Sequence, residues 1–175
     1  MAAVITSGKW REPNSLLPLR WGGYRPRYIA AVGLIIGGGL LVQTGSVYSE
    51  NFLTLGIAAH VAGWLILPAR GPRRVAVAIP SALLVGALLL GSGASVLLVG
   101  PLACWLYLRQ RPALSYLALL MPLISGLVLA QLFPQYGNGI IVAAVSTVVL
   151  IGAAWLARSI AGSRRIPSHP DAAFR

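Results

Sequence analysis

His60 is the side chain with acid–base chemistry that lies deepest within an apolar stretch of the sequence. An imidazole can donate or accept a proton or bind a metal near neutral pH. Inside a membrane span, hydrocarbon disfavours its charged form, and each ring nitrogen requires a partner, so such a residue is a functional-site hypothesis. The alternative is a neutral imidazole that bonds to a hydroxyl or carbonyl of a neighbouring helix. The sequence leaves both interpretations open.

Other polar residues are expected at matching depths. Ser125, Ser146 and Thr147 lie about as far into their apolar stretches as His60 does, which predicts a polar layer in the membrane. Gln43 and Gln131 lie nearer the outer ends and predict a shallow outward-facing cavity. Ser and Thr hydroxyls also bond to their own helix backbone without any function, so the layer is a hypothesis that depends on how the helices pack.

Catalytic and metal chemistry find little support. Ser95 in Gly93–Ala94–Ser95 is predicted several residues shallower than His60, which separates a nucleophile from its base. A single cysteine, Cys104, excludes an internal disulfide and any multi-cysteine metal site. The carboxylates all lie outside the apolar stretches: Glu12, Glu50 and Asp171. We therefore expect no enzyme activity, no metal and no cofactor.

The elements that position these residues follow from composition. The chain has 175 residues, of which 57% are apolar and 10% charged, and its mean hydropathy is +0.79. Soluble domains carry about 25% charged residues, so this composition excludes a soluble enzyme, a disordered tail and a disulfide scaffold. Apolar residues and glycines together supply about 120 positions, enough for about six spans of about 20 residues.

The apolar stretches predict an all-α integral membrane protein with six transmembrane helices, arranged as three antiparallel hairpins. Polar, basic segments flank this membrane domain of residues 28–158: an interfacial N-terminal segment at 1–27 and a cytoplasmic tail at 159–175. The expected helices are 28–46, 52–69, 75–91, 94–108, 113–133 and 138–158.

The distribution of charge predicts the orientation. This threading places all 14 Lys and Arg residues on one side of the membrane, although the net charge is +11. Basic residues are retained in the cytoplasm, so we expect both termini there and a plasma (inner) membrane location. Reading 75–108 as one long helix would move Arg109 and Arg111 outside, which favours a hairpin at Gly91–Gly93. The preference for Arg over Lys and the high Ala content favour a bacterial source.

Aromatic and small residues mark helix ends and helix faces. Trp64, Trp105 and Trp155 each stand near the end of an even-numbered helix, where Trp commonly anchors the inner membrane interface. Two small residues followed by Trp–Leu occur at all three ends, which also fits an internal repeat. Gly33 and Gly37 form a Gly-x-x-x-Gly motif, which is typical of close helix packing within a chain or between subunits.

Two function classes remain open. The first is a non-catalytic membrane component or subunit of a larger assembly, which contacts anionic headgroups through its Arg-rich segments and a protein partner or a second copy of itself. The second is a facilitator or substrate-binding subunit for a small, largely uncharged solute or lipid, which uses the cavity near His60. Nucleic acid is not expected as a partner, because no recognition helix or RNA-stacking motif accompanies the basic residues.

Overall fold

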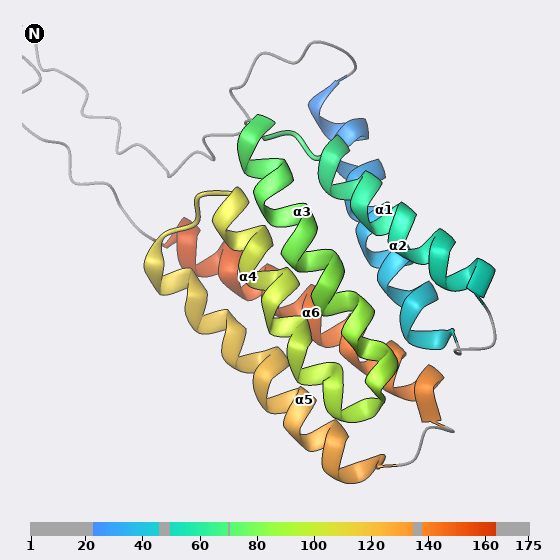
Figure 1. Ribbon diagram of the computed structural model, residues 1–175. Coiled ribbons are helices and arrows are strands. Elements are labelled where there is room, and N and C mark those ends of the chain that lie inside the picture. The colour runs from blue at the N-terminus through green and yellow to red at the C-terminus, as the bar shows by residue number, and fades with distance from the viewer. Residues whose placement is uncertain (1–22, 46–49, 70, 135–137, 164–175) are drawn as a thin grey trace, which may run out of the picture.

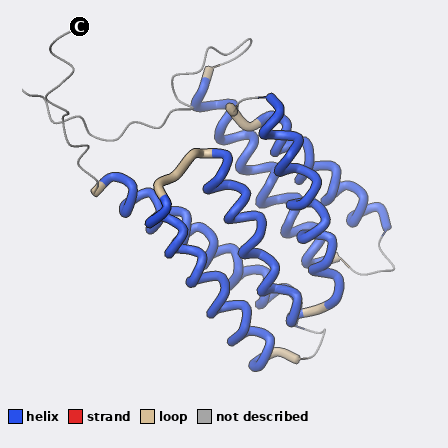
Figure 2. Tube along the Cα trace, turned by 60° about the vertical axis from the view of Figure 1, so that its left-hand side comes forward, coloured by secondary structure: helices blue, strands red, loops and turns tan. Residues whose placement is uncertain are grey.

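The computed structural model describes residues 23–45, 50–69, 71–134 and 138–163, and this part of the chain is helical with no strand (Figures 1 and 2). The expectation of an all-α fold is therefore confirmed. The described helices are α1 (Tyr24–Thr44), α2 (Glu50–Ile66), α3 (Gly71–Gly86) with a 3₁₀ continuation (Ala87–Leu90), α4 (Val99–Leu108) after a 3₁₀ segment (Ser92–Leu98), α5 (Leu120–Leu132) after a 3₁₀ segment (Ala113–Leu119), and α6 (Gly139–Gly162).

Four of the helical segments in this part of the chain are long and apolar enough to cross a membrane: Tyr24–Thr44, Pro72–Leu90, Ala113–Leu132 and Gly139–Gly162. Ser92–Leu108 is apolar but shorter, and α2 has 17 residues, which corresponds to about 25 Å at 1.5 Å per residue. α1 and α3 begin up to four residues before the expected apolar stretches, because their first turns contain arginines that are helical without being apolar. Most of the expected N-terminal segment and of the tail lies outside the described residues.

Consecutive helices pack against each other along the chain, and α6 returns to contact α1. In Figure 1, α2 lies in front of α1, and α4 lies in front of α6. Alanines on α6 fill the contact with the neighbouring helices, since Ala153, Ala157 and Ala161 are fully buried at four-residue spacing. Such small side chains let helices approach closely in a membrane.

The chain reverses at Gly91, between α3 and α4. Gly91 has φ 103° and ψ −170°, a backbone conformation that is essentially restricted to glycine. The 3₁₀ segments on either side of this residue contact each other, and α3 packs along α4. Residues 75–108 are therefore two helices joined by a tight turn, as the placement of Arg109 and Arg111 predicts.

Prolines accompany the 3₁₀ geometry in two helices. Pro101 and Pro122 each follow the end of a 3₁₀ segment by three residues. A proline cannot donate to the carbonyl four residues before it and its ring crowds that carbonyl, which lies in the 3₁₀ segment in both cases. Pro80, in contrast, lies within α3.

α1 and α2 pack backbone against backbone. Gly38, Gly56 and Gly63 form this contact, because a Cβ atom added at any of them would lie within 3.0 Å of atoms of the other helix. The motif residues Gly33 and Gly37 lie elsewhere on α1, and a Cβ placed at either would meet no neighbour from another helix of the described chain within 4 Å. The contact within this chain is thus made by Gly38, and the face of Gly33 and Gly37 is open.

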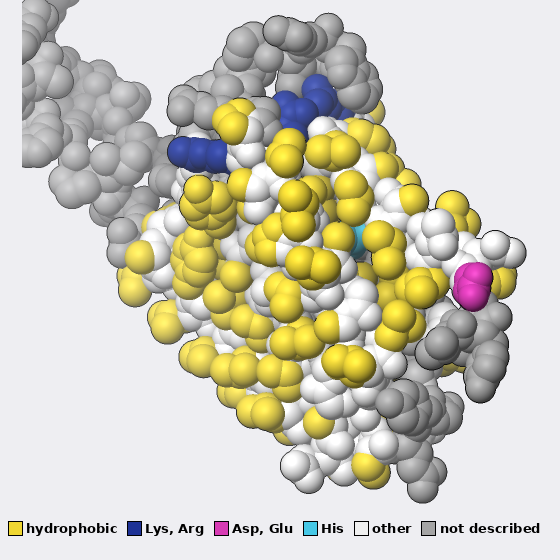
Figure 3. Space-filling model, in the orientation of Figure 1, with side chains coloured by type: hydrophobic (Ala, Val, Ile, Leu, Met, Phe, Trp, Pro, Cys, Tyr) yellow, Lys and Arg dark blue, Asp and Glu magenta, His cyan; other side chains and the backbone are white. Residues whose placement is uncertain are grey.

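Arginines gather at one end of the bundle. Arg27 donates from Nε to the Ile66 carbonyl at 2.6 Å, and Arg74 donates to the carbonyls of Leu65 and Ala69 at 3.0 and 2.7 Å. They satisfy the Leu65 and Ile66 carbonyls in the last turn of α2, where the helix dipole also favours cations, and the Ala69 carbonyl just beyond the helix. Glu50, the carboxylate of the described residues, begins α2 at the opposite end (Figure 3).

Apolar side chains are spread over the face of the bundle that Figure 3 shows. Large exposed examples occur on every helix and include Ile29, Phe52, Leu83, Tyr107, Leu127 and Ile151. Exposure of this extent would drive aggregation in water, whereas it matches a hydrocarbon environment.

Candidate functional site

His60 lies at the centre of a hydrogen-bonded group that joins three helices. Its side chain is 1% exposed, with Nδ1 2.9 Å from the Ile35 carbonyl oxygen of α1 and Nε2 2.8 Å from Ser81 Oγ of α3. Trp64, one turn further along α2, donates from Nε1 to the same Nε2 at 3.0 Å. Both ring nitrogens of His60 are therefore engaged inside the protein.

These partners define the tautomer of the imidazole. The Ile35 carbonyl only accepts, so Nδ1 carries the proton and donates it. Nε2 is then the acceptor, which is what the Trp64 N–H requires, and the Ser81 hydroxyl shares that lone pair. A proton on Nε2 would face the indole N–H. The group is a neutral imidazole that holds α1, α2 and α3 together, which corresponds to the structural alternative for His60.

A groove of about 280 Å³ lies beside this group, between α1 and α6, with α4 contributing to its walls. His60 and Trp64 line it together with apolar residues over most of its length. The α1 residues are Tyr28, Val32, Ile35, Ile36, Gly39, Leu40 and Gln43, the α3–α4 region supplies Val85, Leu98, Pro101, Leu102 and Trp105, and α6 supplies Ser146, Thr147, Leu150, Ile151, Ala154 and Trp155.

The groove is open along the side of the bundle. Ile151 and Trp155 line it, yet they are 52% and 72% exposed. From Tyr28 to Gln43 it follows about 22 Å of α1 at 1.5 Å per residue. The groove therefore opens sideways, along the length of the helices, and not only at one end of the bundle. This differs from the outward-facing cavity that the sequence suggests. Gln43 lines the groove, whereas Gln131 is exposed on α5 and does not.

The residues of the predicted polar layer are divided between two spaces. His60, Ser146 and Thr147 line the groove, but Thr147 Oγ1 donates to the Ala143 carbonyl of its own helix at 2.8 Å. Ser125 instead lines a neighbouring cavity of about 10 Å³, which Ser146 shares. That volume has room for at most one water molecule. The polar group around His60 is completed by Ser81, which sequence depth alone did not indicate.

The three tryptophans have different environments. Trp64 is fully buried and directs its N–H to His60, so the structure places it in the core rather than at an exposed interface. Trp105 is half-buried and lines the groove, and Trp155 is exposed beside it.

Two arginines that the sequence indicated only as topology markers adjoin the groove. The Arg109 guanidinium lies 4.4 Å from the centroid of the Tyr28 ring and 5.1 Å from that of the Trp105 ring. Arg111 lies 5.8 Å from the Trp105 centroid. The signal available in the sequence is the spacing of four between Trp105 and Arg109, which places them on one face of a helix.

Within the described ranges, no three or more His, Cys, Asp or Glu side chains lie together in a way that could hold a metal ion. When the chain is compared with models of protein families, with curated proteins and with solved structures, none of them matches it.

Proposed function

We propose that this chain is a non-catalytic protein of the bacterial inner membrane that holds one hydrocarbon chain of a lipid in the groove between α1 and α6. The observation that carries the proposal is the groove itself, which is apolar, has a volume of about 280 Å³ and opens along the side of the bundle. A site that opens sideways in a membrane receives its ligand from the bilayer.

The proposed topology is six spans in three hairpins, with both termini in the cytoplasm. Its support is the position of the arginines, because Arg27, Arg74 and Arg109 lie at one end of the described bundle and Glu50 lies at the other. In that orientation Tyr28 and Trp105 lie toward the inner leaflet, and Gln43 lies toward the outer one.

The lining of the groove favours a hydrocarbon chain. Most of the side chains along it are aliphatic or aromatic, and it follows α1 from Tyr28 to Gln43, about 22 Å at 1.5 Å per residue. An extended acyl chain can lie along such a groove.

Acyl-chain photolabelling tests the proposal. The purified protein is placed in phosphatidylcholine nanodiscs that contain a phosphatidylcholine with a diazirine in its acyl chain. We expect the label to concentrate on groove peptides around Ile36 and Ile151. Gly39 lines the groove, and a Cβ added there would meet no other helix within 4 Å, so a leucine can be accommodated at this position. Gly39→Leu would place its side chain in the groove and should reduce this labelling.

Gly37→Leu is the matched control, because Gly37 is two residues away, equally open to a Cβ, and does not line the groove. It should leave the labelling unchanged. Equal labelling of the groove peptides and of the exposed α5 residue Leu127, or equal loss in both glycine variants, would contradict the proposal.

A second candidate is a subunit of a larger membrane assembly. The observation in its favour is the open face of Gly33 and Gly37, where an added Cβ would meet no other helix of the described chain within 4 Å. Purification in mild detergent would then yield a stoichiometric partner or a homo-oligomer that Gly37→Leu dissociates and Gly39→Leu retains. A monomer in both variants would contradict this candidate.

A further inference from the structure

We infer that the lipid chain in the groove carries a hydroxyl group within its hydrocarbon, and that Ser146 of α6 binds this hydroxyl. The ligand class is a lipid with a hydroxylated acyl chain, whose ester end lies toward Gln43. This inference rests on the proposed function, since it names the class of lipid whose chain occupies the groove.

Ser146 presents a buried hydroxyl to the groove. The residue is 5% exposed and lines the groove. Within the described part of the chain, Ser146 Oγ makes no hydrogen bond, whereas the hydroxyl of its neighbour Thr147 donates to the Ala143 carbonyl at 2.8 Å. A hydroxyl that faces only hydrocarbon is unfavourable. A ligand that offers Ser146 a hydrogen bond is therefore preferred over one that does not.

The other polar side chains around the middle of the groove are already used. His60 is engaged through both ring nitrogens, and the Trp64 N–H donates to it. Thr147 has given its proton to a backbone carbonyl, but Oγ1 keeps lone pairs that can accept a second hydrogen bond. Ser146 is thus the donor that this part of the groove offers to a ligand, and Thr147 is the acceptor next to it.

A donor beside an acceptor fits a hydroxyl on the ligand. A hydroxyl accepts one hydrogen bond and donates another, whereas a ketone or ester carbonyl only accepts. An ionised group does not fit, because none of the described residues that line the groove is a Lys, Arg, Asp or Glu. A charge at this depth in hydrocarbon would have no counter-charge. The geometry therefore favours an uncharged hydroxyl.

The position of Ser146 determines where on the chain this hydroxyl lies. A Cβ added at Gly139, the first residue of α6, would lie 3.6 Å from the Gln43 carbonyl oxygen, so the end of α1 and the start of α6 are level. Ser146 comes seven residues after Gly139, about 10 Å further along α6 at 1.5 Å per residue. A lipid with its ester near Gln43 brings the inner part of its chain to Ser146.

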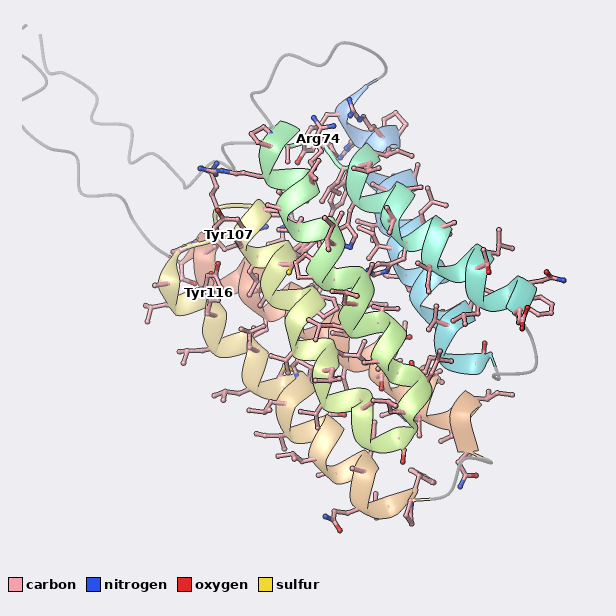
Figure 4. All side chains as sticks on the ribbon, in the orientation of Figure 1. Arg74, Tyr107 and Tyr116 are labelled. Atoms are coloured by element: carbon pink, nitrogen blue, oxygen red, sulfur yellow. The ribbon has the colours of Figure 1, made fainter. Side chains whose placement is uncertain are left out.

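Gln43 suits the ester end of such a lipid. Its side chain lines the groove and makes no hydrogen bond within the described residues. An amide both donates and accepts, so it can bind an ester carbonyl without requiring a charged headgroup. Arg74, labelled in Figure 4, lies at the opposite end of the bundle from the end of α1 that carries Gln43. The lipid chain therefore runs from Gln43 toward the end with the arginines.

A competition between two chains that differ by one hydroxyl tests the inference. The full-length protein and the diazirine phosphatidylcholine are placed in nanodiscs of dioleoyl phosphatidylcholine, and half of this matrix is then replaced by diricinoleoyl phosphatidylcholine. One additional hydrogen bond strengthens binding by about fivefold, so labelling of the groove peptides should fall by about threefold. Labelling of the exposed Leu127 should not change.

Three variants assign the preference to the groove. Ser146→Ala should retain the groove labelling and lose its sensitivity to the ricinoleoyl matrix, and Thr147→Val should weaken that sensitivity. Ser159→Ala is the matched control, because this exposed serine of the same helix bonds to its own backbone and does not line the groove. It should behave as the wild type. Equal labelling in the two matrices, or a Ser146→Ala protein that keeps the threefold decrease, would overturn the inference.

A water molecule is the alternative partner of Ser146. Together with Ser125, Ser146 also lines the cavity of about 10 Å³ beside the groove. If a water there bonds to both hydroxyls, Ser146→Ala and Ser125→Ala should lower the melting temperature alike, and the ricinoleoyl matrix should not reduce labelling. That result would overturn the inference. We expect instead that Ser125→Ala keeps the sensitivity to the ricinoleoyl matrix. Thr147→Val repeats the test if Ser146→Ala does not fold.

The two proposals fail in different ways. If the ricinoleoyl matrix has no effect while Gly39→Leu still reduces the groove labelling, only the hydroxyl inference fails. If the probe labels the groove peptides no more than Leu127 in either matrix, the proposed function fails as well.

Discussion

Gly38 of α1 and Gly56 of α2 face each other so closely that a Cβ added at Gly38 would lie 2.5 Å from the Gly56 carbonyl oxygen. The same Cβ would lie 2.6 Å from the backbone nitrogen of His60. Backbone atoms cannot turn away as a flexible side chain can. Together with Gly63, whose added Cβ would lie 2.8 Å from the backbone nitrogen of Ile35, this contact sets the distance between α1 and α2, and with it the distance between His60 and Ile35.

Gly38→Ala should accordingly destabilise the protein. We expect a loss of about 1–3 kcal/mol, the usual range for overpacking, with the helices forced apart. Gly37→Ala, one residue away, should be neutral or stabilising by up to about 1 kcal/mol, because its Cβ meets no neighbour and alanine is the better helix former. Unfolding of the detergent-solubilised variants measures both. Equal stability of the two variants would contradict this packing.

The His60 group predicts non-additive effects. Trp64→Phe removes the indole donor and Ser81→Ala removes the hydroxyl, and each should cost about 1 kcal/mol. Because both groups bond to the same Nε2, the double variant should differ from the sum of the single ones by about 0.5 kcal/mol or more. Ser159→Ala, an exposed serine bonded to its own helix, serves as the control. Strict additivity would show that the two donors act independently.

His60 itself is predicted to be structural. His60→Ala leaves the Trp64 N–H and the Ser81 hydroxyl without their buried acceptor and should lower thermal stability, by about 2 kcal/mol or more. The decrease should be the same in nanodiscs with and without diricinoleoyl phosphatidylcholine. A decrease that appears only with one lipid would assign His60 to ligand binding instead.

Gln110 is held in the left-handed region, where a side chain costs about 1–2 kcal/mol relative to glycine. Gln110→Gly should therefore stabilise the protein by about 1 kcal/mol, and Gln110→Val should destabilise it. Lipid labelling at the groove should be retained in Gln110→Gly, because the turn keeps its hydrogen bonds from Gln110 N to Tyr107 O and from Arg111 N to Leu106 O. Thermal melting measures the order of the three proteins, and a less stable glycine variant would contradict the assigned turn.

The proposed topology predicts which introduced cysteines react from each side. In a Cys104→Ala background, Gly93→Cys should be labelled by an impermeant thiol reagent in intact cells, since Gly93 is exposed in the turn after α3. Ser163→Cys, exposed at the end of α6, should be labelled only after permeabilisation. The proposed topology has an odd number of spans between these two positions, so labelling of both from the same side would contradict it.

The lengths of the apolar stretches and the residues between them were sufficient to predict an all-helical chain and the reversal at Gly91. The hydropathy of a stretch indicates whether it is long and apolar enough to cross a membrane. A glycine between two such stretches indicates a turn whose backbone conformation other residues avoid. Both signals depend only on neighbouring residues in the sequence. The positions of Arg109 and Arg111 even distinguished two helices from one long helix. They did not indicate that these arginines lie over the rings of Tyr28 and Trp105.

What only the tertiary structure decided is which face of each helix packs. In water, an apolar stripe identifies the buried face, but in a bilayer the lipid-facing and packed sides are both apolar, so periodicity carries little information. The Gly-x-x-x-Gly motif therefore pointed to Gly33 and Gly37, whereas the contact with α2 is made by Gly38. Ser81 is not part of any motif, yet it is the hydrogen-bond partner of His60. The sequence indicates how deep a residue lies along its helix, whereas helix packing determines which way each helix is rotated about its axis.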